Sequence, residues 1–352
     1  MSRGKKRTLF VGPFGPPYNG DGVKNSYLRD GFEGAGIDGI QWFDTIARNQ
    51  PRWKNNLKLI RLMVSANQII FSLNQNGRYY ILPIFWFLGL FLKKRGVLYV
   101  VGGSFDKQLA KLAPWRRRFF VKMLNSLDGV FAESFALKEG LEKCGLTNVV
   151  LVYNPRKDDG SQWQLNESMR RKGVFVSRVT ASKGILVLLE AIVKLNQSGE
   201  SIDLDIYGPM DAAHEKEVFR WIEEAGGQIR YKGILDPSMV QSILTGYHFL
   251  ALPTFHSGEG LPGILVEAGM AGIPIVITRF NALPEYFKQD ESALFVEPKD
   301  SEGLGHAVLR LVNEDELASA LSEGIKRVVV PFRLESIIQQ SLRLLDEYNW
   351  KI

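Results

Sequence analysis

The sequence has one cysteine, Cys144, and only four histidines among its 352 residues. A single cysteine excludes a disulfide framework and suits a reducing compartment. No Cys/His cluster has the spacing of metal ligands, so we expect no bound metal and no cofactor. All four histidines lie after residue 213, so the first half of the chain offers no histidine base.

The sequence also lacks an apolar run long enough to span a bilayer. An apolar segment at residues 79–92 has fourteen residues and is interrupted by Pro83 and Gly89. We interpret it as a buried helix. The run at residues 8–12, after the basic start, is too short for a signal peptide and is typical of a first buried strand. These features favour a cytoplasmic protein.

Acidic residues are few in the first half of the chain. Residues 1–155 contain 23 Lys and Arg against 10 Asp and Glu, a balance of +13, whereas residues 156–352 contain 21 against 28, a balance of −7. This asymmetry indicates two domains with different partners.

Three consecutive arginines lie between aromatic residues in one part of the basic half. The segment 114–124 combines Arg116, Arg117 and Arg118 with Trp115 and two phenylalanines. This pattern fits a helix on an anionic membrane surface at the inner face of the membrane. A plain solvated face remains an equal alternative. No nucleic-acid motif accompanies the segment, so we expect no nucleic-acid partner.

Strand-like and helix-like runs alternate along the whole chain. In the first half, strands are predicted at residues 8–11, 39–43, 68–73, 97–101, 129–132 and 149–152, and helices at 23–35, 56–67, 81–94, 116–127 and 134–144. After a polar, turn-rich stretch at 153–161, the same alternation resumes and continues to residue 348. This pattern predicts an α/β fold with two Rossmann-like domains, residues 1–155 and 156–333, that face a cleft. Ligands are expected at the carboxyl ends of the strands.

A glycine-rich segment follows the first predicted strand. It runs over residues 12–23 and includes Gly20 and Gly22. Such a loop before a helix allows the backbone to approach a phosphate or a sugar closely. It is not a Gly-x-Gly-x-x-Gly fingerprint, and no Walker lysine follows, so a dinucleotide oxidoreductase is disfavoured.

Two cations, Arg178 and Lys183, stand between a predicted strand and a predicted helix at the start of the second half. At the carboxyl edge of a parallel sheet they can clamp a diphosphate and neutralise a departing nucleotide. The alternative is a pair of surface charges. The position of Arg178 and Lys183 beside the expected cleft favours their role as a diphosphate clamp.

The pair Asp203 and Asp205 resembles a metal ligand set. Both residues lie in the middle of a predicted strand, between Ile202 and Ile206. A carboxylate there would not meet a nucleotide, so we reject a metal site at this pair.

Two glutamates, Glu259 and Glu267, flank the start of a predicted helix at residues 263–271. Pro262 suits the first turn, and Gly272 ends the helix. The helix N-terminus attracts a phosphate, and the two glutamates are separated by roughly 10 Å, about the length of a sugar–diphosphate–ribose unit. Because its neighbours are apolar, Glu267 is expected to be largely buried and to need partners.

Taken together, these residues resemble the retaining nucleotide-sugar glycosyltransferases of family 4. The pair Glu259 and Glu267 is similar to the Glu-x7-Glu motif of that family, and Arg178 with Lys183-Gly184 is similar to its phosphate clamp. Further matches are Tyr207-Gly-Pro209, Lys232-Gly-Ile234 and the Gly20-Asp-Gly22 segment, which has one inserted residue.

The resemblance implies a GT-B fold and a metal-independent transfer with retention at the anomeric carbon. Glu259 would hold hydroxyls of the donor sugar, Glu267 the ribose, and Arg178 with Lys183 the diphosphate. The implied donor-binding set also includes Gly20, Gly22, Gly208, Gly233, Ile234, Gly260 and Leu261. The final helix, residues 334–352, is expected to pack back on the first domain.

The stretch at residues 101–106 stands where many relatives of that family carry a histidine near the reacting carbon. Here it contains Ser104 and Asp106 instead. We hypothesise that Asp106 or Ser104 faces the donor.

The leading hypothesis is an enzyme that transfers a sugar from a nucleotide-sugar donor to a lipid-linked acceptor or a polysaccharide in cell-surface glycan synthesis. The basic first domain would contact the membrane. A non-catalytic nucleotide-sugar-binding protein and a nucleotide-sugar epimerase remain as alternatives. Transfer or hydrolysis of the donor would exclude the first of these, and the match to family 4 argues against the second.

Overall fold

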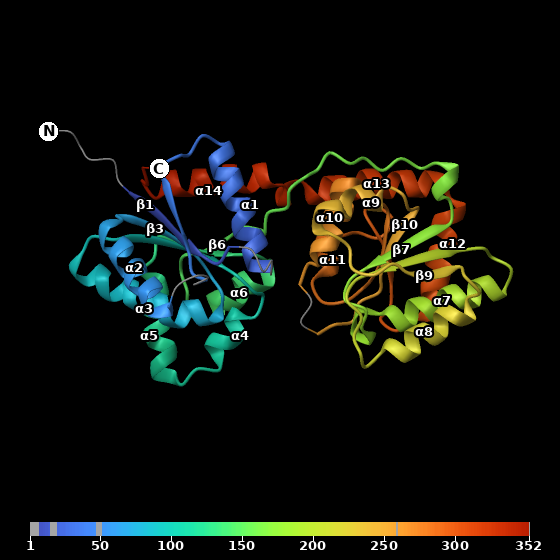
Figure 1. The fold of residues 1–352 in the computed structure, drawn as a ribbon, viewed down its shortest axis with the longest axis horizontal. Helices are drawn as coiled ribbons and strands as arrows, with labels where there is room; N and C mark the ends of the chain where they lie inside the picture. Colours follow the sequence, from blue (N-terminus) through green and yellow to red (C-terminus); the bar gives the residue numbers. More distant parts are fainter. Residues whose placement is uncertain (1–6, 15–19, 47–50, 258–259, 352) are drawn as a thin grey trace. The chain divides into compact units, whose positions relative to one another are not determined.

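The computed structural model describes residues 7–14, 20–46, 51–257 and 260–351. The chain forms two compact units, Met1–Lys157 with Phe332–Ile352 and Asp158–Pro331 (Figure 1). The boundaries expected from the sequence, after residues 155 and 333, lie two residues from these divisions. Each unit is built around one parallel sheet, and the predicted α/β fold with two Rossmann-like domains is confirmed.

The sheet of the first unit has six parallel strands in the order β2-β1-β3-β4-β5-β6. The strands are β1 (Thr8–Gly12), β2 (Ile40–Asp44), β3 (Gln68–Leu73), β4 (Arg95–Val100), β5 (Gly129–Ala132) and β6 (Val149–Leu151). The strands between the two edges are apolar along nearly their whole length because helices cover both faces of the sheet. The strand order reverses between β1 and β3, and ligands bind at the carboxyl ends beside such a reversal.

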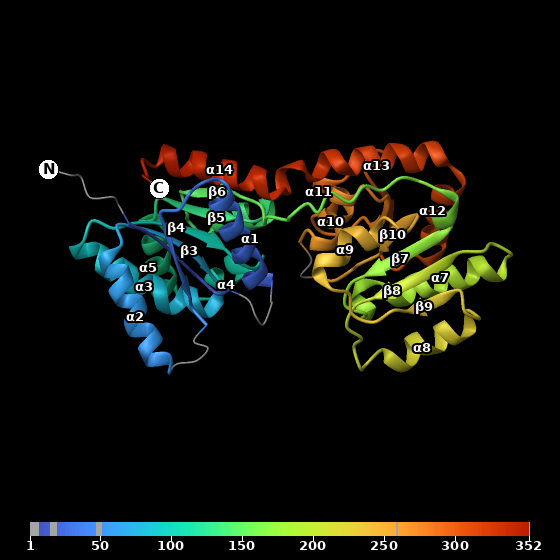
Figure 2. The same ribbon diagram turned by 45° about the horizontal axis from the view of Figure 1, so that its top comes forward.

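Two layers of helices cover the first sheet (Figure 2). One face carries α1 (Gly20–Gly34) and α14 (Leu334–Glu347), and the Tyr99 hydroxyl donates to Ser341 Oγ of α14 at 2.6 Å. The other face carries α2 (Arg52–Ser65), α3 (Gln75–Phe91), α4 (Phe105–Ala110), α5 (Pro114–Asn125) and α6 (Phe135–Lys143). The last helix of the chain therefore packs on the first unit.

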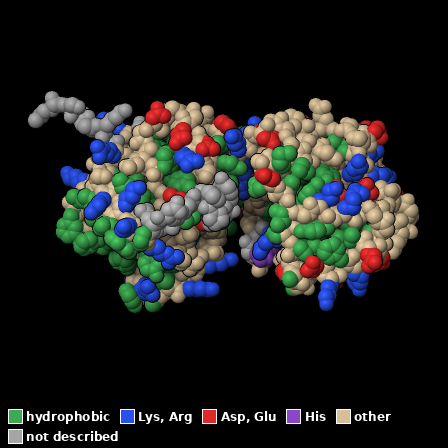
Figure 3. Space-filling view, viewed as in Figure 1, with side chains coloured by type: hydrophobic (Ala, Val, Ile, Leu, Met, Phe, Trp, Pro, Cys, Tyr) green, Lys and Arg blue, Asp and Glu red, His purple; other side chains and the backbone are tan. Residues whose placement is uncertain are grey.

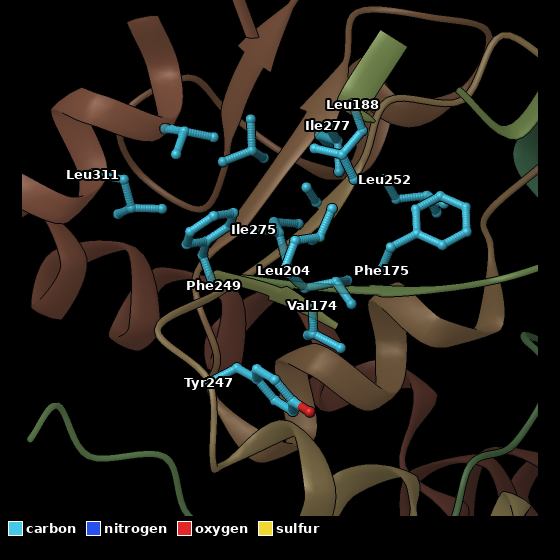
Figure 4. Packing of buried hydrophobic residues seen from close by; sticks show 14 of the residues in the cluster. Val174, Phe175, Leu188, Leu204, Tyr247, Phe249, Leu252, Ile275, Ile277 and Leu311 are labelled. Carbon is cyan, nitrogen blue, oxygen red and sulfur yellow. The ribbon is translucent and has the colours of Figure 1, made fainter. Parts of the chain in front are cut away.

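The sheet of the second unit also has six parallel strands, in the order β12-β11-β10-β7-β8-β9. The strands are β7 (Lys172–Val176), β8 (Asp203–Tyr207), β9 (Ile229–Tyr231), β10 (Phe249–Leu252), β11 (Ile275–Thr278) and β12 (Leu294–Val296). Val174, Phe249 and Ile275 contribute fully buried side chains to its core (Figure 4). The order reverses between β7 and β10, which places the expected ligand position at their carboxyl ends.

Among the residues that the structure describes, seven α-helices accompany these strands, five of them between strands and two after β12. They are α7 (Ile185–Gln197), α8 (Glu215–Glu224), α9 (Val240–Leu244), α10 (Gly263–Ala271), α11 (Leu283–Tyr286), α12 (Ser301–Asn313) and α13 (Asp315–Val329). The helix predicted at residues 263–271 is confirmed as α10. It packs closely on α13 because Gly269 has no side chain, and a Cβ there would lie 2.3 Å from Val329 Cγ1.

The sequence placed some helices incorrectly. Helix α3 begins at Gln75, six residues before the predicted start, because the Asn74 side chain caps it by accepting from the Gly77 N–H at 3.0 Å. The short helices α4 and α11 were not predicted, since four to six residues show too little periodicity. Among the described residues, no helix combines the length and apolar character needed to cross a bilayer.

A buried histidine makes the second unit sensitive to acid. His248 is fully buried just before β10, and its Nδ1 accepts the Arg171 N–H at 3.2 Å. Burial lowers the pKa of His248 from 6.5 to about 4. The unfolded chain therefore binds more protons below pH 6.5, so this contribution to stability is present above pH 6.5 and is lost as the pH falls through 4.

We expect this histidine to account for a loss on the order of 2–3 kcal/mol of unfolding free energy between pH 6.5 and pH 4. Urea unfolding of the wild type and His248→Asn at several pH values measures it. The asparagine oxygen can accept the Arg171 N–H but does not titrate, so the variant should show a shallower pH dependence. Parallel curves would contradict the assignment.

Candidate functional site

The loops that follow β7 and β8 run side by side at the carboxyl edge of the second sheet. The Ser177 N–H donates to the Tyr207 carbonyl at 3.1 Å, and the Val179 N–H donates to the Pro209 carbonyl at 2.9 Å. Between these two bonds lies Arg178, whose side chain is exposed. The paired backbone therefore presents one cation of the predicted clamp to solvent from a fixed position.

A glycine allows these two loops to approach each other. Gly208 has φ of +133°, and a Cβ there would lie 1.8 Å from the Ser177 carbonyl oxygen. Its N–H donates to the Gly233 carbonyl at 2.9 Å, and its carbonyl accepts from the Tyr231 hydroxyl at 2.8 Å. Ile234, which is 75% exposed, follows Gly233. The structure thus brings three residues of the implied donor-binding set, Gly208, Gly233 and Ile234, together at the ends of β8 and β9.

The second cation of the clamp lies in the turn between β7 and α7. Lys183 ends a 3-10 turn at Ala181–Lys183 and is only 8% exposed. The next residue, Gly184, has φ of +80°, and a Cβ there would lie 2.1 Å from the Pro253 carbonyl oxygen. This close approach holds the turn against the segment that follows β10. Lys183 therefore stands where the strand order reverses.

Helix α10 begins after β10, beside the turn that carries Lys183. Glu267 lies in this helix and is partly buried, between the buried Val266 and Ala268. Its apolar neighbours Leu265 and Val266 turn into the core, whereas Glu267 lies at the edge of the buried side. Gly272 ends the helix with φ of +85°.

The loop between β10 and α10 is described in part. Gly260 is exposed, and Leu261 packs partly against the core of the second unit. Glu259, the predicted ligand of the donor sugar, lies outside the described residues. The described part places Gly260, Leu261 and Glu267 after β10 and the two cations after the neighbouring strand β7, so all of these residues belong to one edge of one sheet.

The other predicted donor residues belong to the first unit. Gly20 and Gly22 lie in the first turn of α1, because this helix begins three residues before the predicted start at residue 23. The expectation of a glycine loop over the whole of residues 12–23 was therefore wrong at its end. Both glycines nevertheless stand just after β1, at the carboxyl edge of the first sheet.

Asp106 is in the first turn of α4, and its carboxylate is directed toward α6. A Cβ on Gly140 of α6 would lie 2.4 Å from Asp106 Oδ2. Asp106 Oδ1 is buried without a hydrogen-bond partner among the described residues. The side chain thus packs between two helices; of the two residues hypothesised to face the donor, Ser104 is exposed and Asp106 is partly buried.

A charged cluster that the sequence patterns did not indicate lies at the carboxyl edge of the first sheet. Lys24 of α1 is 2% exposed, and its Nζ donates to the Val100 carbonyl at 3.2 Å. Burial lowers the pKa of Lys24 to about 8, and the carboxylates of Glu133 and Asp21 oppose this effect. Burial raises the pKa of Asp21, with Lys24 opposing. These groups therefore form an interacting set of opposite charges.

Arg78 holds the ends of two strands beside this cluster. It is 1% exposed, and its Nη1 donates to the Leu73 carbonyl at 2.9 Å and to the Val101 carbonyl at 2.8 Å. Its guanidinium also lies 4.2 Å from the ring centroid of Phe105. Burial lowers the pKa of Arg78 to about 10. This arginine fixes the backbone after β3 and β4.

The sequence does carry a signal for Lys24 and Arg78, because each is spaced four residues from a buried apolar residue of its helix. Lys24 shares a helical face with Leu28 and Phe32 at steps of four residues, and both of these are fully buried. Arg78 precedes the buried Leu82 by the same step. A cation on the buried face of an amphipathic helix indicates a polar cluster beneath it.

The carboxylates of Asp203 and Asp205 have a structural role. Arg230 pairs with both, at 3.3 Å to Asp203 and 2.8 Å to Asp205, and the Tyr247 hydroxyl donates to Asp205 at 2.7 Å. They line a shallow groove on one face of the second sheet together with Tyr207. Among the described residues, no three His, Cys, Asp or Glu side chains gather as metal ligands do.

Comparison with known sequences finds a match in the second unit. Residues 158–328 match the family described as "Glycosyl transferases group 1". The lipopolysaccharide core biosynthesis glycosyltransferase LpsE of Rhizobium meliloti is 28% identical over 205 residues, which cover 57% of this chain and 55% of LpsE. The D-inositol 3-phosphate glycosyltransferase of Corynebacterium glutamicum is 26% identical over 184 residues, which cover 49% of this chain and 44% of that enzyme. The chain thus matches about half the length of these curated relatives.

Comparison with solved structures extends the likeness to the whole fold. The structure of HepE of Anabaena in complex with UDP superposes with a TM-score of 0.72, covering 97% of this chain and 100% of HepE. The two sequences are 14% identical. The expected GT-B type of fold, with two Rossmann-like domains, agrees with this likeness.

Proposed function

From the match of residues 158–328 to the family described as "Glycosyl transferases group 1", we propose that the chain is a retaining glycosyltransferase of cell-surface glycan synthesis. It moves a sugar from a nucleotide-sugar donor to a lipid-linked acceptor or a growing polysaccharide. It works on the cytoplasmic side of the membrane, with its basic first unit toward the membrane surface. HepE, whose fold this chain shares, was crystallised with UDP, so uridine diphosphate sugars are the first donors to test.

The observation that carries this proposal is the gathering of donor-type groups where β7 and β10 meet. Arg178 and Lys183 follow β7, Glu267 lies in the helix after β10, and Gly208 with Gly233 lines the ends of β8 and β9. The carboxyl edge at a reversal of strand order is where α/β sheets bind nucleotides.

Each group has a chemical task in the proposed transfer. Arg178 and Lys183 bind the diphosphate and stabilise the negative charge that grows on it as the glycosidic bond breaks. Two cations held by the chain supply the charge that a divalent metal would otherwise bring, which supports a metal-independent reaction. Glu267 accepts hydrogen bonds from the ribose hydroxyls, and Glu259 from hydroxyls of the donor sugar.

The base and the reacting carbon involve further residues. The open backbone around Gly208, Gly233 and Ile234 receives the base, and Gly260 with Leu261 borders the sugar. Asp106 is not carried into the proposal because its carboxylate is directed toward α6. The cluster of Lys24, Asp21 and Glu133 at the edge of the first sheet supplies polar groups for the acceptor instead.

A thermal-shift panel of UDP-, GDP- and ADP-sugars, with and without EDTA, tests the donor site. A donor at about 100 times its dissociation constant should stabilise the wild type by roughly 2.7 kcal/mol. We expect one base class to stabilise the wild type and the control Glu223→Ala, an exposed site on α8, but not Glu267→Ala. EDTA should change nothing.

The outcomes separate the alternatives. No shift with any nucleotide sugar would count against a donor site. A shift without release of nucleoside diphosphate in the presence of acceptors would favour a non-catalytic binding protein. Conversion of the sugar without an acceptor would favour an epimerase.

A further inference from the structure

Helix α2 has an apolar stripe that faces solvent. Its members follow one another at steps of four, three and four residues and are Trp53, Leu57, Ile60 and Val64, which are 63%, 43%, 36% and 47% exposed. The same helix buries a separate stripe, with Leu59 and Met63, against the sheet. Helix α2 is therefore apolar on two sides, and only one of them contributes to the core.

Helix α3 repeats this arrangement. Its exposed stripe has the same steps and consists of Tyr80, Ile84, Phe87 and Phe91, with Leu90 beside it. The rings of Phe87 and Phe91 lie 5.2 Å apart, and their side chains are 57% and 74% exposed. The interpretation of residues 79–92 as a buried helix is thus right only for the side that carries Leu82 and Phe85.

The two stripes belong to one surface. Helices α2 and α3 pack into the same core cluster on the same face of the sheet and are neighbours in both views (Figures 1 and 2). Helix α5 adjoins α3 through the rings of Trp86 and Phe119, and its Trp115 is 72% exposed. We name the exposed stripes of α2 and α3 together with Trp115 the apolar–basic face.

Cations surround these apolar side chains, and carboxylates are almost absent. Residues 45–127 contain 15 Lys and Arg and a single acidic residue, Asp106, a net charge of +14. Asp106 itself is directed toward α6. The exposed cations of α2 are Arg52, Lys54, Lys58 and Arg61, and those of α5 are Arg116, Arg117 and Arg118. Figure 3 shows hydrophobic and basic side chains intermingled over these helices.

Apolar stripes surrounded by cations fit one class of partner better than the others. A second copy of the chain would bring its own cations against these, and like charges across an interface are costly. A nucleic acid would use the cations and some aromatic rings, but it gains nothing from aliphatic side chains such as Leu57, Ile60 and Val64. The boundary between headgroups and acyl chains of an anionic bilayer accepts both the apolar stripes and the cations around them.

We propose that the apolar–basic face docks onto an anionic lipid bilayer, with its aromatic and aliphatic side chains inserted at the headgroup boundary and its lysines and arginines at the lipid phosphates. The apolar–basic face is thus the surface through which the proposed enzyme would contact the membrane. Only the biological purpose of the docking rests on the proposed function. Binding itself needs neither donor nor transfer.

Flotation of the full chain with lipid vesicles tests the apolar stripe. The vesicles are phosphatidylcholine alone or with about 30% phosphatidylglycerol, a lipid that supplies the negative surface. We expect the wild type to bind only the anionic vesicles. The double variant Phe87→Gln, Phe91→Gln should need roughly tenfold more lipid for half-binding. The matched control is Phe135→Gln on α6, where a phenylalanine is 49% exposed outside the face.

A second set of variants tests the cations. The triple variant Lys54→Gln, Lys58→Gln, Arg61→Gln on α2 should bind more weakly than the wild type and lose most of its dependence on salt, because fewer charges remain to be screened. The control, Lys138→Gln with Lys143→Gln on α6, removes one partly exposed and one exposed cation outside the face and should behave as the wild type does.

Three further outcomes of these experiments would either overturn the docking proposal or distinguish it from the proposed glycosyltransferase function. Absence of vesicle binding by a folded wild-type chain would overturn it. A wild-type dimer in solution that the phenylalanine double variant converts to a monomer, with no vesicle binding, would assign the face to a second copy. Vesicle binding by a chain that transfers no sugar would support the docking surface and count against the proposed function alone.

Discussion

Replacing Lys183 by alanine is expected to lower kcat/KM for sugar transfer by on the order of 100- to 1,000-fold. Lys183 is 8% exposed and lies where the order of strands reverses, so its ammonium would act on the departing diphosphate in surroundings that screen charge weakly. The charge on the diphosphate grows as the bond to the sugar breaks. The lysine should therefore contribute more to kcat than to donor binding.

Steady-state release of nucleoside diphosphate measures this effect once the donor is known. Lys183→Arg keeps the positive charge and should retain part of the rate. Lys194→Ala is the matched control, since this lysine of α7 is 59% exposed and pairs with Glu190 in solvent. A folded Lys183→Ala protein with kcat/KM within about threefold of the wild type would remove Lys183 from the catalytic group.

Replacing Gly208 by alanine is expected to destabilise the second unit by about 3 kcal/mol and to abolish donor binding. The new Cβ would lie 1.8 Å from the Ser177 carbonyl oxygen, and the φ of +133° is a region that side chains avoid. The loops after β7 and β8 would have to separate. The hydrogen bond from the Val179 N–H to the Pro209 carbonyl would then be lost, and Arg178 would move with it.

Thermal unfolding and nucleotide-sugar binding together check this prediction. The control is Gly227→Ala, because Gly227 also has a positive φ, of +98°, but nothing lies within 4 Å of its added Cβ. The control therefore carries the backbone strain without the collision. If both variants lost the same stability and both bound donor, the close approach at Gly208 would not be what holds the site.

Much of the fold was visible in local sequence signals. The strands β3 and β5 have the predicted bounds, because buried parallel strands are short apolar runs with sharp polar ends. Helix α10 was located by the proline before it and the glycine after it. The cations Arg178 and Lys183 were found because they stand directly at the junction of a strand and a helix.

Other features depended on contacts between distant parts of the chain. Lys24 interacts with Glu133, more than a hundred residues away, and no local sequence pattern connects these two residues. Asp106 follows a glycine-rich stretch that suggested a site. Its carboxylate packs against α6 instead, because Gly140 of that helix has no side chain and allows the close approach.

The sequence by itself determined the alternation of strands and helices, the two-domain organisation, the family motifs and the excess of cations in the first half. These follow from residue periodicity, from glycine and proline at element ends, and from composition. Only the tertiary structure decided which apolar faces are covered. A period of 3.6 residues shows which side chains of α2 and α3 share a face, but whether another element packs against that face depends on the path of the whole chain. The exposed stripes of these two helices became visible for that reason alone.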